Sequence, residues 1–246
     1  MSGDQLLAVD VGTQSVRALL FDAAGTLLAR TKVPIEPYVA PHPGWAENHA
    51  ELYSGAVGEA CRALTADPAV RVDAIAGLAL TTQRGTIVVV DGDGRPLRPA
   101  IVWLDQRRTE GLPRIGGLDG VAFRVVGVAD TVAAFQADCE ANWLIAHEPA
   151  PWAQTDKYLL LSGFLLHRLV GRYVDADAAQ VGYIPFDYRR RRWADSGDWK
   201  WRAMPVERDM LPELVSTGGR LGDLTPQAAG HLGLPAGLPV IAAGAD

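Results

Sequence analysis

The sequence predicts a single α/β domain, with strands early in the chain and at its end and helices between them. Three observations support this fold class: strands dominate the start of the chain, helical periodicity dominates the middle, and an apolar strand, Pro239–Ala243, lies close to the end. No repeat or low-complexity linker divides the 246 residues. A chain of this length can bury one large core.

The opening segment has the pattern of a β-meander. Leu6–Asp10 and Val16–Phe21 are apolar strands joined by a Gly-Thr turn, and Thr26–Val33 follows a second turn at Asp22–Gly25. Buried strands are also expected at three later apolar runs, Ile75–Leu80, Ile87–Val90 and Ala100–Trp103.

Helices are expected between these strands. The first extends from about His49 to Leu64, with Asn48 as its N-cap. Ala137–His147 and Tyr158–Val170 also carry helical periodicity, and Gly171 closes the second of them. The polar, aromatic stretch Arg189–Trp201 is expected to be irregular.

Composition excludes several classes of protein. A net charge of −6 and a pI of about 5.4 argue against general nucleic-acid binding, which usually needs a basic face. The one basic run, Arg189–Arg192, is interpreted as a solvated face, with a phosphate or partner contact as the alternative. The sequence has no membrane-spanning stretch and no signal peptide. It has two cysteines, and their spacing is not that of a metal site. A cytoplasmic protein is therefore expected.

The first chemical constellation is Asp10–Ser15, which joins two predicted strands. Gly12 lets the backbone turn tightly, so that nearby amides and the hydroxyls of Thr13 and Ser15 can face phosphate oxygens. Asp10 can hold a magnesium ion through water. Neither a P-loop nor a Rossmann glycine motif is present, and a plain hairpin turn is the alternative.

The second constellation has the side chains that a sugar pocket needs. Gln83, Arg84 and Asp105 can match hydroxyl groups, and Trp103 can cover the C–H face of a sugar. Trp103 alone would be read as a core residue, but its neighbours favour a pocket. Phe135 is either a further aromatic wall or a core side chain.

Five segments, in order, resemble the FGGY carbohydrate kinases, and the resemblance covers essentially the whole chain. Asp10–Thr13 resembles the first phosphate motif of the actin–hexokinase–sugar kinase superfold. Pro43–Glu47 resembles the P-G-W-x-E loop, Thr82–Arg84 the substrate loop of the glycerol kinase branch, and Ala100–Asp105 a segment of the xylulokinase branch. Ala243–Asp246 resembles the segment that ends in the catalytic aspartate.

The resemblance implies an actin-like ATPase (ribonuclease H-like) fold, with a mixed central sheet flanked by helices. It also implies ATP-dependent phosphorylation of a sugar or polyol hydroxyl. Asp246 is then the general base, and Asp10 holds Mg²⁺. A surface acid is the alternative for Asp246. The remaining roles are phosphate binding by Gly12, Thr13, Gln14 and Ser15, and substrate binding by Gln83, Arg84, Trp103, Asp105 and Phe135.

The sequence departs from each branch of the family near the expected substrate. Gly85 stands where the glycerol kinase pattern has glutamate, and the histidine of the xylulokinase pattern is missing. Because Gly85 leaves room, a ketose such as a pentulose is favoured over glycerol. Asp175–Gln180 departs from the usual Asn-Ala-Ser type of stretch, which leaves its role open.

Family members are about twice as long, so residues 1–246 are expected to be the substrate-binding N-terminal domain of a two-domain kinase. The isolated chain should bind sugar weakly and turn over little or no ATP. The expected partner is a small sugar or polyol, without nucleic acid or membrane, and a homodimer of the full-length protein is left open. Two alternatives are a non-catalytic sugar-binding or regulatory protein and an actin-fold ATPase that acts on protein partners.

Overall fold

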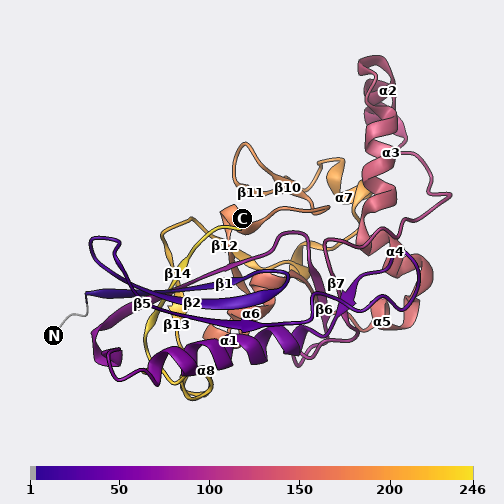
Figure 1. The fold of residues 1–246 in the computed structure, drawn as a ribbon. Coiled ribbons are helices and arrows are strands. Elements are labelled where there is room, and N and C mark those ends of the chain that lie inside the picture. Colours follow the sequence, from indigo (N-terminus) through magenta and orange to yellow (C-terminus); the bar gives the residue numbers. More distant parts are fainter. Residues whose placement is uncertain (1–3, 246) are drawn as a thin grey trace.

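A six-stranded mixed sheet forms the centre of the computed structural model, which describes residues 4–245 (Figure 1). Its strand order is β13 (Arg220–Asp223), β14 (Pro239–Ala242), β5 (Ile75–Thr82), β1 (Gln5–Val11), β2 (Ser15–Asp22) and β3 (Leu27–Pro34). β1, β5 and β14 run parallel, whereas β2 is antiparallel to both of its neighbours. The predicted meander, final strand and mixed sheet are confirmed.

One face of this sheet carries the main core. Alternate residues of β1, Leu7, Val9 and Val11, are buried against helices α1 (Ala50–Thr65), α6 (Leu161–Val170) and α8 (Pro226–Leu232). The opposite face contains an apolar hollow of about 480 Å³ whose lining comes from β1, β2, β5, β14 and the turn after β2. Leu6, in this hollow, is 52% exposed. The two faces of the sheet therefore differ in how they are covered by the described residues.

A second sheet separates two hydrophobic cores. It consists of β4 (Glu47–Asn48), β7 (Ala100–Ile101), β6 (Ile87–Val90) and β8 (Lys157–Leu160), in that order and antiparallel throughout. In β6, Val88 and Val90 face the main core, while Ile87 and Val89 face a second core. Burial on both faces explains why β6 is a continuous apolar run.

The first helix is confirmed, but its predicted cap is wrong. α1 begins at Ala50 with His49 in the cap position, and no side chain caps it. Asn48 belongs to β4, where it pairs with Ala100, and its amide group donates to the carbonyl oxygen of Glu36 (2.7 Å). Strand pairing therefore outcompetes the local capping preference of asparagine.

Two predicted helices are shorter than expected. The segment from Ala137 is interrupted at Cys139, whose extended backbone separates α3 (Ala129–Asp138) from α4 (Glu140–His147). The segment from Tyr158 begins as strand β8, because its first residues pair with β6, and becomes helix α6 only at Leu161. Gly171 ends α6 in the left-handed conformation (φ 70°), as predicted.

The hairpin formed by α2 (Gly117–Val126) and α3 was not predicted, and it projects from the body of the molecule (Figure 1). Within residues 4–245, no helix is long and apolar enough to cross a membrane.

The remaining elements are short. The helices are α5 (Pro149–Ala153), α7 (Lys200–Ala203) and the 3₁₀ helices η1 (Val72–Ala74), η2 (Asp177–Ala179) and η3 (Arg208–Met210). The strands are the parallel pair β9 (Val174–Ala176) and β12 (Glu213–Val215), and the hairpin β10 (Phe186–Asp187) and β11 (Arg192–Trp193).

Candidate functional site

The predicted chemical segments meet at one edge of the central sheet, where parallel strands β1, β5 and β14 end. The backbone N–H of Gln83 donates to the carbonyl oxygen of Val11 (2.8 Å). The Thr81 hydroxyl donates to the carbonyl oxygen of Gly244 (2.7 Å). Asp246, the predicted base, follows Gly244 closely in the sequence but lies outside the described residues. The carboxyl ends of parallel strands are a common place for ligand sites in α/β sheets.

The turn between β1 and β2 forms the predicted phosphate hairpin. The N–H of Gly12 donates to the carbonyl oxygen of Ser15 (3.0 Å), which closes the turn, and Ser15 is buried. Gln14 is exposed at the tip. The Thr13 hydroxyl accepts a hydrogen bond from the indole N–H of Trp103 (3.0 Å). This contact brings the first and second predicted constellations together.

Asp10 lies on β1 just before this hairpin and has one cationic neighbour. Its Oδ2 atom accepts a hydrogen bond from Arg17 on β2 (2.7 Å), and its side chain is 24% exposed. No group of three or more metal-ligating side chains occurs among the described residues. A Mg²⁺ ion would therefore take few protein ligands here, which is usual for Mg²⁺ bound together with phosphates and water.

The loop after β5 holds the predicted hydroxyl-binding side chains. Gln83 is buried, and its amide N–H donates to the Tyr53 hydroxyl (3.1 Å). Its Oε1 atom is buried without a hydrogen-bond partner in the described part of the chain. Arg84 is exposed, and Gly85 has a φ of +60°; a Cβ atom there would lie 3.5 Å from the Cβ of Trp103. Glycine at position 85 therefore suits the left-handed backbone of this turn.

A cavity of about 360 Å³ lies beside Trp103, whose side chain is 52% exposed. Phe135 does not line it; its ring is 40% exposed and lies 6.0 Å, between centroids, from Tyr183, which does. The volume suits a small ligand. The lining residues are Gly85, Val102, Trp103, Asp105, Gln106, Arg107, Arg108, Asp138, Glu140, Gly182 and Tyr183.

Asp105 lies at the edge of this cavity but is already fully hydrogen-bonded. Its Oδ1 accepts from the backbone N–H and the Nε of Arg107 (2.9 and 2.7 Å). Its Oδ2 accepts from Nη2 of Arg107 (2.6 Å) and from the backbone N–H of Ala46 (2.7 Å). The structure thus places Asp105 as an anchor of neighbouring loops, and its contact with a substrate stays a prediction.

Sequence reasoning missed the acidic wall of the cavity formed by Asp138 and Glu140. Asp138 pairs with Arg108 (2.6 Å). Burial, together with the negative charges of Asp105 and Asp138, raises the pKa of Glu140 to about 8. The residue is partly exposed, yet its Oε2 atom is buried without a hydrogen-bond partner among the described residues. The break between α3 and α4, which sequence periodicity did not reveal, brings both carboxyl groups to the cavity.

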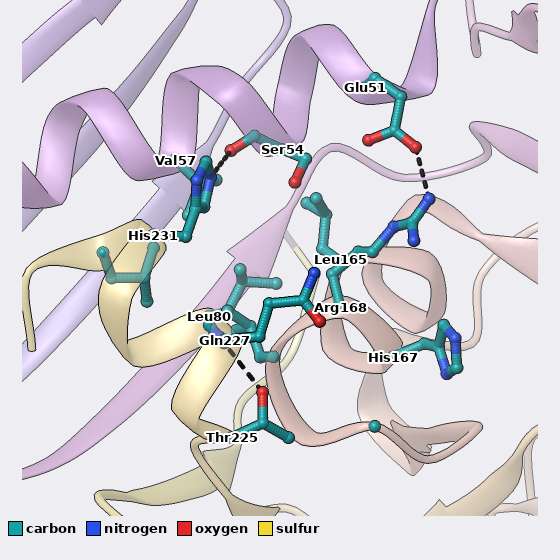
Figure 2. Close-up of a pocket in the computed structure, with 14 residues that line it drawn as sticks. Glu51, Ser54, Val57, Leu80, Leu165, His167, Arg168, Thr225, Gln227 and His231 are labelled. Carbon is teal, nitrogen blue, oxygen red and sulfur yellow. Dashed lines mark hydrogen bonds and ion pairs between the residues drawn. The ribbon is translucent and has the colours of Figure 1, made fainter. Parts of the chain in front are cut away.

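A larger cavity, of about 520 Å³, lies on the helical face of the sheet between α1, α6 and α8 (Figure 2). No predicted site residue lines it. Several of its polar groups are bonded to one another: Arg168 pairs with Glu51, and the ring of His231 contacts the carbonyl oxygen of Ser54 (2.9 Å). The predicted site residues therefore lie at the edge of the sheet and not around this cavity.

Comparisons with known proteins agree with this arrangement. Residues 5–246 match the model of the FGGY family of carbohydrate kinases, N-terminal domain. The chain is 26% identical over 243 residues to the xylulose kinase of Lactococcus lactis subsp. lactis, covering 98% of this chain and 47% of the relative. It is 32% identical to the glycerol kinase of Rhodospirillum rubrum, covering 90% and 45%.

A solved structure is similar in fold as well as in sequence. The crystal structure of a xyloylose kinase from Brucella ovis superposes with a TM-score of 0.81 at 26% identity, covering 98% of this chain and 49% of that one. The chain thus spans about half the length of the relatives that it matches. The mixed sheet, the edge at which the motifs meet and the match over residues 5–246 together show that the chain belongs to the FGGY family of carbohydrate kinases, as its N-terminal domain.

Proposed function

We propose that this chain is the substrate-binding half of a two-domain kinase that transfers the γ-phosphoryl group of ATP to a hydroxyl of a ketose, such as a pentulose, or of another polyol. The observation that carries the proposal is the hydrogen bond from Trp103 to Thr13, because it joins the wall of the cavity to the phosphate hairpin. A sugar stacked on Trp103 would then lie next to a phosphate held by the hairpin.

In this proposal the hairpin binds the transferring phosphate. The backbone amide of Thr13 and the side chains of Thr13 and Gln14 would stabilise its negative charge. The N–H of Gly12 closes the turn and Ser15 is buried, so these two residues would shape the hairpin around the phosphate. Asp10 would hold Mg²⁺, which supplies positive charge to the phosphates when bound. Since Arg17 already contacts Asp10 (2.7 Å), the ion would have to share this carboxylate with Arg17 or displace it.

The proposed role of Asp246 is to orient the acceptor hydroxyl and take its proton. Such general base catalysis typically contributes about a hundred- to ten-thousand-fold in rate. Thr81, which donates to the Gly244 carbonyl, supports the segment that leads to Asp246. Gln83, Arg84 and Trp103 would hold the remaining hydroxyls and the C–H face of the sugar.

Two features support a ketose or larger polyol over glycerol. The cavity of about 360 Å³ exceeds what a three-carbon polyol needs, and Gly85, which lines it, adds no side chain to it. Related proteins named xylulose kinase, L-fuculokinase and glycerol kinase match at 26%, 28% and 32% identity. These names are consistent with a sugar or polyol substrate and do not select between a ketose and glycerol.

The apolar face of the central sheet supports the two-domain arrangement. Its hollow of about 480 Å³ includes Leu6, which is 52% exposed, and the partly exposed Phe21 and Ile241. Contiguous apolar surface of this kind usually marks an interaction site. We propose that the second half of the kinase covers this face and supplies most of the ATP site. The isolated 246-residue chain is accordingly expected to bind sugar weakly and to turn over little or no ATP.

The kinase proposal is tested by measuring ADP release with Mg-ATP against a panel of ketoses and polyols, using the chain extended to the full length of its relatives. Sugar-dependent release is expected, and Asp246→Asn should lower its rate about a hundred- to ten-thousand-fold because the general base is lost. Asp209→Asn, at an exposed position on η3, is the matched control and should leave the rate unchanged.

Two other outcomes would replace the proposal. A folded full-length protein that binds sugar without releasing ADP would be a non-catalytic sugar-binding or regulatory protein. ADP release that is independent of every sugar would indicate an actin-fold ATPase that acts on protein partners.

The hydrogen bond from Trp103 to Thr13 gives a second prediction, for the variant Trp103→Phe. This change keeps an aromatic wall but removes the N–H that donates to Thr13, so kcat/KM for the sugar should fall about three- to tenfold. Trp152→Phe, on α5 away from the cavity, is the control. Equal kcat/KM values in the two variants would show that the hydrogen bond has no part in catalysis.

A further inference from the structure

Two sequence features have no place in the site described above: the segment Asp175–Gln180 and the basic run Arg189–Arg192. The structure brings them together through one ion pair, in which Nη2 of Arg191 lies 2.7 Å from Oδ1 of Asp177. The other arginines behave differently, because Arg190 and Arg192 both pair with Asp195 at the surface. Within the basic run, Arg191 is thus the residue that pairs with a buried carboxylate, while its own side chain is 53% exposed.

The backbone at Arg191 is in an unusual conformation. Its φ of 52° is the only positive value of a non-glycine residue in the described range 4–245. The left-handed region is disfavoured for residues with a Cβ atom, so surrounding contacts must hold Arg191 there. The contacts that the structure provides are those of its guanidinium group with Asp177 and with the Thr217 hydroxyl (3.0 Å).

Asp177 is a buried carboxylate with a defined set of partners. Its side chain is only 6% exposed. Besides Arg191, its Oδ1 atom accepts hydrogen bonds from the backbone N–H of Thr217 (3.1 Å) and from the Thr217 hydroxyl (3.0 Å). A buried carboxylate is tolerated only with such charge and hydrogen-bond compensation. Arg191, Asp177 and Thr217, hereafter the Arg191 clamp, are therefore one interdependent unit.

The Arg191 clamp holds the turn against which β14 ends. The N–H of Gly218 donates to the carbonyl oxygen of Ala242 (2.9 Å), and the N–H of Ala242 donates to the carbonyl oxygen of Gly219 (2.8 Å). Ala178, which follows Asp177 in the chain, lies close to the segment after β14. A Cβ atom on Gly244 would be 3.6 Å from the Cβ of Ala178. The chain neighbours of the clamp, Gly218 and Gly219 after Thr217 and Ala178 after Asp177, thus contact the end of β14 and the segment that follows it.

We propose that Arg191 and Asp177 are positioning residues that fix the segment 242–245 and, through it, the orientation of Asp246. The part of the inference that concerns Asp246 rests on the proposed kinase function. The clamp would act on the rate of phosphoryl transfer and not on sugar affinity, because none of its members lines the cavity beside Trp103. A small misplacement of a catalytic group can reduce the rate severely.

The first test measures amide hydrogen exchange in the 246-residue chain by NMR. Arg191→Gly removes the guanidinium group and also relieves the left-handed backbone, so the variant should fold. Exchange at the amides of Gly218 and Ala242 should become about tenfold faster, because both hydrogen bonds depend on the clamped turn. Asp177→Asn should have a smaller effect in the same direction. Arg189→Gly, at an exposed position in the same run, is the matched control.

The second test measures kinase kinetics in the chain extended to full length. Arg191→Gly should lower kcat about tenfold with the KM for sugar nearly unchanged, and Arg191→Lys should restore part of the loss because it keeps the charge. Wild-type exchange rates at Gly218 and Ala242 in Arg191→Gly would overturn the clamp. Faster exchange with an unchanged kcat would overturn its link to Asp246. Inactivity of the unmodified full-length protein would refute the proposed function, while the exchange rates would still decide the clamp.

Discussion

Replacing Arg107 by alanine is expected to lower the free energy of unfolding by about 3–5 kcal/mol, the usual cost of removing one partner from a buried ion pair. Arg107 is 3% exposed and contacts the carboxylates of Glu47 (2.8 Å) and Asp105 (2.6 Å). Its guanidinium group also lies over the rings of Trp45 (3.9 Å to the centroid) and Trp143 (4.5 Å). Alanine would remove all of these contacts at once.

The neighbouring residue provides a matched control for Arg107. Arg108 is 54% exposed and pairs with Asp138, so Arg108→Ala should cost no more than about 1 kcal/mol. Urea unfolding followed by tryptophan fluorescence measures both variants, and Arg107→Lys, which keeps the charge but loses the planar fork, should be intermediate. Similar values for the two alanine variants would mean that the buried network contributes little to stability.

The second large effect is a pH dependence of stability caused by Glu140. Its pKa is raised from 4.5 to about 8 in the folded protein, chiefly by burial. Between these values the folded state binds a proton that the unfolded state has lost, so stability falls as pH rises. For one group the slope is at most about 1.4 kcal/mol per pH unit. Glu140→Gln should remove this slope and make the protein more stable at pH 8.

Other titrating groups determine where this effect should be measured. Burial raises the pKa of Asp175 from 3.8 to about 6, which adds a slope of the same sign at lower pH. Burial also lowers the pKa of His167 from 6.5, which gives the opposite slope below that pH. Urea unfolding between pH 6.5 and 8 therefore isolates Glu140, with the exposed Glu110→Gln as the control. A flat wild-type curve over this range would contradict the raised pKa.

The sequence by itself determined the main course of the fold. The meander after Leu6, the apolar runs of β5 and β6, the final strand and the glycine that ends α6 all carry local signals, and each was predicted correctly. The order of the five motifs was sufficient to predict the family that the comparison over residues 5–246 then showed. Local patterns failed at Asn48 and at Tyr158, where pairing with a distant strand overrides the preference of the segment itself.

Only the tertiary structure decided which side chains act on one another. Trp103 and Thr13 are 90 residues apart in the chain, yet they share a hydrogen bond because β1 and the second sheet meet at one edge. Asp105 is predicted to contact a sugar, and only the fold shows that each of its carboxylate oxygens also accepts two hydrogen bonds, from Arg107 and Ala46. Side-chain partners depend on distances between elements that no local pattern encodes, so the sequence determined the residue types of the site, and the fold determined how those residues are paired.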